Sequence, residues 1–218
     1  MLEAVIFDFD GVIADTPTYY FRHMKSLLKR RNADISDEHI SALVGHNFSE
    51  KLEFINKNYG LGITLEDFIE ETSVPARKEM SEKIGLDPFL KKLLLELKEK
   101  NVPLAIATTN VRKNVSFILE KFGISEGFFS HIVTAEHVRK SKPFPDIYIK
   151  AIELLGAEKS RCVAVEDTLI GVQSAKAAGL KAVALPNSFT EKQDFSSADR
   201  VIKSFRELDF KGLEALVE

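Results

Sequence analysis

Polar side chains that could take part in a reaction follow four separate apolar runs of the sequence. The group contains carboxylates, hydroxyls, one amide and one lysine. Its members are Asp8 and Asp10; Thr108, Thr109 and Asn110; Lys142; and Glu166 and Asp167. Asp8 and Asp10 stand one residue apart in the stretch FDFDGVIADT. Gly11 follows them and lets the chain turn, so that both aspartates can reach one site.

The chemistry open to such a set is narrow. Carboxylates held within a few ångströms repel one another unless a cation neutralises them. A set of hard oxygen ligands suits Mg²⁺, which usually takes a couple of carboxylates, several waters and a substrate phosphate. A lysine and a hydroxyl beside that ion suit a phosphoryl group. The residues therefore predict magnesium-dependent phosphoryl chemistry, provided that the fold brings them together.

The apolar runs predict the sheet that would do so. Five of them read as buried strands, at residues 2–9, 102–108, 131–134, 161–166 and 181–185. Helical patterns lie between them, at residues 111–122, 145–156 and 169–179. This alternation from about Asp87 onward predicts an α/β fold with an open, parallel, Rossmann-like sheet and helices on both faces. In such sheets ligands bind beyond the carboxyl ends of the strands, which is where the polar residues lie.

Residues 15–86 interrupt the alternation. They show helical periodicity without a convincing strand, which predicts a small all-α cap of four or five helices inserted after the first strand. Asp15 and Thr16 before Pro17 predict a capped helix start, and Pro75 is expected to end or kink a later helix. The predicted domains are a catalytic core of residues 1–14 and 87–218 and a cap of residues 15–86.

Composition excludes several classes of protein. The chain has 218 residues, a net charge of −3 and a pI of about 6.0, which argues against a nucleic-acid or membrane-surface binder. Cys162 is the single cysteine, so no internal disulfide forms, and its apolar surroundings predict an inert strand residue. MLEAVIFDFD lacks the basic start of a signal peptide, and we expect a cytoplasmic protein.

Each local pattern also has a purely structural interpretation. Asp10 with Gly11 is a common turn signal, and the polar residues after residue 107 could cap the next helix. A lysine before proline often lies in a solvated loop, and Glu166 with Asp167 could cap a helix. The convergence of all four patterns on one sheet edge favours a functional site.

Taken in order, the motifs DFDGVIADT, ATTN, KPFPD and VEDTLIGVQSAKAAG resemble the haloacid dehalogenase (HAD) superfamily. The resemblance is to the branch with a helical cap after the first strand, which includes β-phosphoglucomutase and phosphoglycolate phosphatase. It covers nearly the whole chain. It implies that Asp8 attacks phosphorus and becomes an aspartyl-phosphate, while Asp10 acts as general acid and then as general base.

The resemblance also implies the binding roles. Thr108, with Thr109 and Asn110, would hold phosphoryl oxygens, and Lys142 would pair with phosphate and nucleophile. Mg²⁺ would be held by the Asp8 carboxylate, the Asp10 backbone carbonyl and Asp167, with Glu166 in contact directly or through water. Dehalogenation is disfavoured, because expelling a halide requires neither a proton donor nor a metal.

The cap residues bear on the substrate. Where the mutase of this branch has a histidine in the first cap helix this chain has Tyr20, and Phe48 lies close to the position of an arginine that holds a second phosphate. The loss of that arginine favours a phosphatase of a small phosphorylated metabolite, with a β-phosphoglucomutase-type enzyme as the alternative. Gly45 and His46 belong to the expected specificity loop. A non-catalytic protein on this fold is the remaining class, and we expect a monomer or a weak homodimer.

Overall fold

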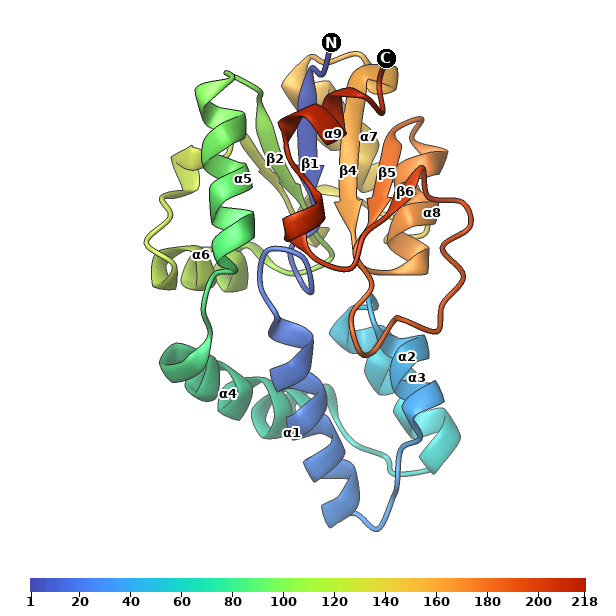
Figure 1. The fold of residues 1–218 in the computed structure, drawn as a ribbon. Helices are drawn as coiled ribbons and strands as arrows, with labels where there is room; N and C mark the ends of the chain where they lie inside the picture. Colours follow the sequence, from blue (N-terminus) through green and yellow to red (C-terminus); the bar gives the residue numbers. More distant parts are fainter. The chain divides into compact units, whose positions relative to one another are not determined.

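The computed structural model describes all residues from Met1 to Glu218 and divides into two compact units. One comprises Met1–Ala14 and Gly85–Glu218, and the other comprises Asp15–Ile84 (Figure 1). The first holds the sheet, and the second is entirely helical apart from its connecting segments.

The sheet has six parallel strands in the order β3-β2-β1-β4-β5-β6, which confirms the predicted fold class. The strands are β1 (Ala4–Phe7), β2 (Leu104–Ala107), β3 (His131–Val133), β4 (Cys162–Glu166), β5 (Lys181–Ala184) and β6 (Arg200–Val201). The first strand lies at the centre, where Val5 is paired with both Leu104 and Val163. Central strands buried on both faces need apolar side chains throughout, which explains the continuous runs in the sequence.

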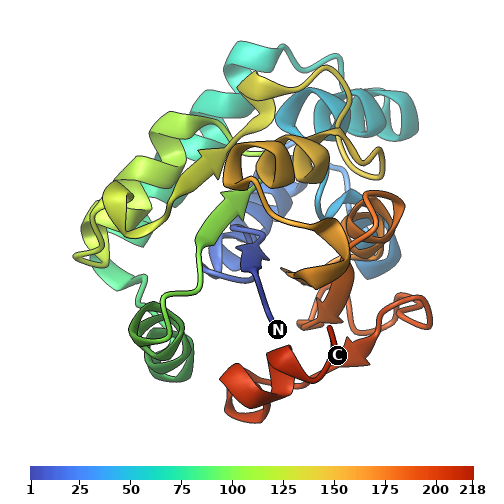
Figure 2. The ribbon, with the colours of Figure 1, turned by 90° about the horizontal axis from the view of Figure 1, so that it is seen from above.

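Helices cover both faces of the sheet. They are α5 (Pro88–Glu99), α6 (Arg112–Lys121), α7 (Asp146–Leu155), α8 (Leu169–Ala177) and α9 (Phe210–Glu214). Figure 2 shows α7 and α8 on one side of the strands and α5 and α9 on the other. Ala4 and Ile6 of β1 pack with Tyr148 of α7 and Val172 of α8 in one buried cluster. Short side chains on this face let the helices approach the strands closely, and this brings Tyr148 under the site described below.

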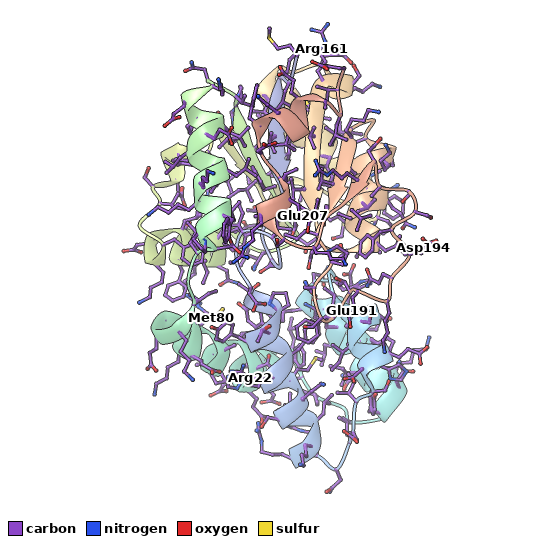
Figure 3. All side chains as sticks on the ribbon, in the orientation of Figure 1. Arg22, Met80, Arg161, Glu191, Asp194 and Glu207 are labelled. Atoms are coloured by element: carbon purple, nitrogen blue, oxygen red, sulfur yellow. The ribbon has the colours of Figure 1, made fainter.

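The helical unit contains α1 (Thr16–Arg30), α2 (Asp37–Leu43), α3 (Phe48–Tyr59) and α4 (Leu65–Lys83). Arg22 on α1 and Met80 on α4 are labelled in Figure 3, and Arg22 forms an ion pair with Glu79 of α4. The expected ending of a helix at Pro75 is wrong, because α4 continues through it. The packing of α4 against α1 outweighs the backbone hydrogen bond that the proline removes.

The starts of α1 and α4 differ. Asp15 precedes α1 but its side chain makes no capping hydrogen bond, so the expected acidic cap is absent. Instead, Pro17 lies in the first turn, where its fixed φ angle already suits a helix. The Thr64 side chain accepts a hydrogen bond from the backbone N–H of Asp67 at 3.1 Å and caps α4.

No helix has both the length and the apolar character needed to cross a bilayer.

Candidate active site

The parallel register brings the ends of three strands to one edge of the sheet. Asp8 directly follows β1, Thr108 follows β2 and Glu166 ends β4, and β1 lies between the other two strands. The backbone N–H of Asp8 donates to the Val165 carbonyl at 2.9 Å, and this bond holds Asp8, the candidate nucleophile, beside β4. Three segments that are far apart in sequence therefore present their polar side chains together.

Lys142 joins two of the acids. Its Nζ lies 2.5 Å from Asp8 Oδ1, 2.6 Å from Glu166 Oε1 and 3.1 Å from the Ala107 carbonyl oxygen. All three side chains are buried or nearly so. Burial alone would lower the pKa of Lys142, but the neighbouring carboxylates of Asp8 and Glu166 outweigh it and raise the pKa. The lysine is therefore a fixed positive charge at neutral pH.

The acids outnumber this lysine. Asp8, Glu166 and Asp167 each offer an oxygen, and these atoms all lie within 4.8 Å of one another. Burial, reinforced by the neighbouring carboxylates, raises the pKa of Asp8 to about 8 and also raises the pKa of Asp167. Asp167 Oδ1 is buried without a hydrogen-bond partner. An orphaned carboxylate oxygen among other acids fits a divalent cation.

The Asp10 carboxylate is held by the segment that follows β2, which lies on the other side of β1 from β4. The Asn110 side-chain amide donates to both oxygens of the Asp10 carboxylate at 3.1 Å, and Thr108 Oγ1 donates to Oδ2 at 3.4 Å. Thr109 lies between these two residues and is half-buried. Gly11 has a φ of +92°, and a Cβ there would lie 2.0 Å from Asp167 Oδ2. The bare backbone after Asp10 therefore packs directly on the Asp167 carboxylate.

Tyr148 and Asn187 also contact the acids, although neither was singled out from the sequence. The Tyr148 hydroxyl donates to Glu166 Oε1 at 2.6 Å, and the Asn187 amide donates to Asp167 Oδ2 at 2.8 Å. Tyr148 is a single polar group on the buried face of α7, which sequence periodicity does not distinguish from core. Asn187 follows the fifth apolar run, so the same strand-end signal that identified the acids could have found it.

The sequence matches the family model described as haloacid dehalogenase-like hydrolase over residues 5–185. The chain belongs to this family. It is 31% identical over 217 residues to protein CbbY of Cereibacter sphaeroides, covering 95% of this chain and 94% of that protein. The crystal structure of a CbbY mutant from Rhodobacter sphaeroides with xylulose-(1,5)bisphosphate superposes with a TM-score of 0.87 at 28% identity, covering 98% of this chain and 100% of the other.

Two further relatives of this HAD-like hydrolase have different names. One is the phosphorylated carbohydrates phosphatase of Thermotoga maritima, 28% identical and covering 84% of each chain. The other is the β-phosphoglucomutase of Bacillus subtilis, 29% identical and covering 95% of this chain and 92% of that protein. The relatives of this chain thus include a protein named as a phosphatase and one named as a sugar-phosphate mutase. This confirms the class of phosphoryl-transfer enzyme that the motifs predict.

Gly45 and His46 lie in the helical unit, between α2 and α3. Gly45 has a φ of +85°, and His46 Nδ1 lies 3.2 Å from Glu50 Oε2. Phe48 contacts Tyr20 edge-on at 5.5 Å and Phe68 at 6.3 Å between ring centroids. Phe48 thus packs within the helical unit of this HAD-like hydrolase, while contact of Gly45 and His46 with a substrate stays a prediction.

Proposed function

We propose that this HAD-like hydrolase is a Mg²⁺-dependent phosphatase of a small phosphorylated metabolite, a sugar phosphate or a similar compound, which acts through an aspartyl-phosphate on Asp8. The observation that carries the proposal is the buried lysine bridge. Lys142 holds Asp8 and Glu166 together while a neighbouring carboxylate oxygen, Asp167 Oδ1, has no partner. This combination provides a positioned nucleophile, a fixed positive charge and a buried carboxylate oxygen that could bind a metal ion.

The residues fit Mg²⁺ by their chemistry. Asp8 and Asp167 would hold it with the backbone carbonyl of Asp10, and Glu166 would contact it directly or through a water molecule. When bound, Mg²⁺ neutralises the clustered carboxylates and stabilises negative charge on the phosphoryl oxygens. Lys142 remains paired with Asp8 and Glu166, so the fixed positive charge does not depend on the metal.

The protein's own residues divide the reaction into two displacements. An Asp8 oxygen attacks phosphorus, and the bond from phosphorus to the leaving oxygen breaks as Asp10 gives that oxygen a proton. Asp10 then takes a proton from water, the water oxygen attacks phosphorus, and the bond to Asp8 breaks to release inorganic phosphate. Asn110 and Thr108 hold the Asp10 carboxylate at the site, and amides or side chains of residues 108–110 bind phosphoryl oxygens.

A sugar phosphate is supported by the relatives. The similar proteins include a phosphatase named for phosphorylated carbohydrates and a structure that holds a sugar bisphosphate. The second candidate function is a β-phosphoglucomutase type of reaction, because an enzyme of that name matches nearly the whole chain. A mutase must grip a second phosphate, and the loop from Gly45 to Phe48 has no arginine to grip it bidentately.

Phosphorus NMR distinguishes the two reactions. The purified protein is incubated with Mg²⁺ and β-glucose 1-phosphate plus a trace of its 1,6-bisphosphate, and in parallel with a panel that includes phosphoglycolate and pentose phosphates. Inorganic phosphate that grows with wild type and not with Asp8→Asn supports the phosphatase. Growth of glucose 6-phosphate with little inorganic phosphate would instead establish the mutase, and an absence of Mg²⁺-dependent turnover would overturn both.

A further inference from the structure

The loop after β5 makes a contact that the proposed chemistry does not use. Its residue Asn187 donates the side-chain amide to Asp167 Oδ2 at 2.8 Å. We propose that Asn187 is a positioning residue that fixes the rotation of the Asp167 carboxylate, so that Oδ1 is presented to a divalent cation. The proposal rests on the metal site of the proposed function and adds a residue that lies outside the family motifs quoted above.

The surrounding turn determines which end of the Asn187 amide faces Asp167. Asn187 Oδ1 accepts a hydrogen bond from the backbone N–H of Phe189 at 2.9 Å, and only the amide oxygen can accept one. The amide nitrogen must therefore point to the carboxylate. A nitrogen with two hydrogens donates and does not ligate metal ions, so Asn187 orients Asp167 without competing for the cation.

The loop holds Asn187 itself firmly. Its backbone N–H donates to Thr190 Oγ1 at 3.0 Å, and its carbonyl oxygen accepts from the backbone N–H groups of Thr190 and Glu191 at 3.0 and 2.9 Å. Thr190 is fully buried. The chain then continues through Glu191 and Asp194 (Figure 3). Asn187 is thus one fixed point of a hydrogen-bonded turn, and its amide has a defined direction.

The two oxygens of Asp167 have unlike surroundings. Oδ2 receives the Asn187 amide and lies against Gly11, where a Cβ would approach to 2.0 Å. Oδ1 is buried without a partner, and Asp167 lies in the cluster that includes Asp8 and Glu166. If the carboxylate rotated, Oδ2 would lose its bond to Asn187 and Oδ1 would leave its present position. A partner that prevents this rotation stabilises the geometry that Mg²⁺ requires, and such outer contacts typically change metal affinity ~10–100-fold.

The test measures metal binding by calorimetry on the full-length, metal-free protein, with Mg²⁺ and with Ca²⁺. Asn187→Ser keeps an oxygen that can accept from Phe189 but is too short to reach Asp167, and Asn187→Ala removes both contacts. Ser188→Ala is the matched control, since Ser188 is an exposed residue of the same turn and its replacement leaves the bonds of Asn187 to Asp167, Phe189 and Thr190 in place. Melting in EDTA checks that each variant is folded.

The expected result is a Kd for Mg²⁺ that is higher by ~10-fold or more in both Asn187 variants and unchanged within about threefold in Ser188→Ala. Ca²⁺ tolerates irregular coordination, so its Kd should change by less than about threefold, and selectivity for Mg²⁺ should fall. Equal losses for both ions, an equal loss in Ser188→Ala, or unchanged Mg²⁺ affinity in Asn187→Ser would overturn the proposal. A wild type that binds no Mg²⁺ would overturn the metal site itself.

Discussion

Replacing Lys142 with methionine removes the positive charge between two buried acids while keeping most of the side-chain volume. In the metal-free protein Asp8 and Glu166 would then face each other across a buried site without the Nζ group that now lies 2.5 and 2.6 Å from them. Breaking a buried charge network by removing one partner typically costs ~3–5 kcal/mol. We expect Lys142→Met to lose stability of this order in EDTA.

The loss should be visible as a melting shift. For proteins of about 150–250 residues, 1 kcal/mol moves Tm by roughly 2–4 °C, so the expected decrease is about 6–20 °C. Turnover of p-nitrophenyl phosphate should fall by at least ~100-fold, because a donor that stabilises the transition state is lost. Calorimetry in EDTA and in saturating Mg²⁺, together with steady-state kinetics, measures both effects.

A second substitution separates stability from catalysis. Adding Glu166→Gln to Lys142→Met removes one of the two buried acids that lost their lysine partner, while the new amide oxygen can still accept from Tyr148. We expect the double variant to regain at least half of the lost Tm in EDTA and none of the lost activity. Full activity in Lys142→Met, or a double variant less stable than the single one, would refute the reasoning about the lysine bridge.

Three further predictions concern the same acids. Burial gives Asp8 a pKa of about 8 without metal, far above its value near 4 in the unfolded chain. The contribution of Asp8 to the free energy of unfolding is therefore complete below about pH 4, and it is lost as the pH rises towards 8. Tm in EDTA should therefore fall between about pH 5 and pH 8, and the increase caused by Mg²⁺ should grow over that range; a flat profile in EDTA would contradict this. A Cβ at Gly171 would lie 2.0 Å from Glu166 Oε2, so Gly171→Ala should lower Tm and turnover even though alanine favours a helix. Gly85→Ala is the control: a Cβ there has nothing within 4 Å, so neither Tm nor turnover should change. Tyr148→Phe should cost ~1.5–3 kcal/mol, measured by denaturant unfolding in EDTA, because the hydroxyl donates to a buried carboxylate; an unchanged midpoint would show that this hydrogen bond contributes nothing.

The sheet was predictable because its strands are buried on both faces. Continuous apolar runs located β1 to β5, with ends displaced by at most two residues. β6 was not foreseen, since Arg200 and Val201 form no apolar run and owe their strand pairing to β5. An ending of the helix at Pro75, one of the two expected outcomes, was wrong for a related reason: local propensity argues for a break, whereas contacts with a distant helix keep α4 continuous.

The site was predictable to the extent that its residues follow strands. Parallel pairing alone brings Asp8, Thr108 and Glu166 to one edge, and the sequence contains that information. The contact of Tyr148 with Glu166 was not predictable, because it depends on how closely α7 packs on small side chains of the sheet. Asn110 was expected to bind phosphate, and the structure adds a hydrogen-bonded contact with Asp10 that spacing could not indicate.

The central claim is that a phosphoryl group is transferred to Asp8. It can be tested by rapid acid quench after mixing with p-nitrophenyl phosphate and Mg²⁺, followed by borohydride reduction, which converts an aspartyl-phosphate to homoserine that mass spectrometry can locate. The Asp10→Asn variant should accumulate the modification, because nitrophenolate leaves without a proton while the attacking water lacks its base. We expect homoserine at position 8, and more of it in Asp10→Asn than in wild type. Turnover without any modified Asp8, or modification at another residue, would contradict it.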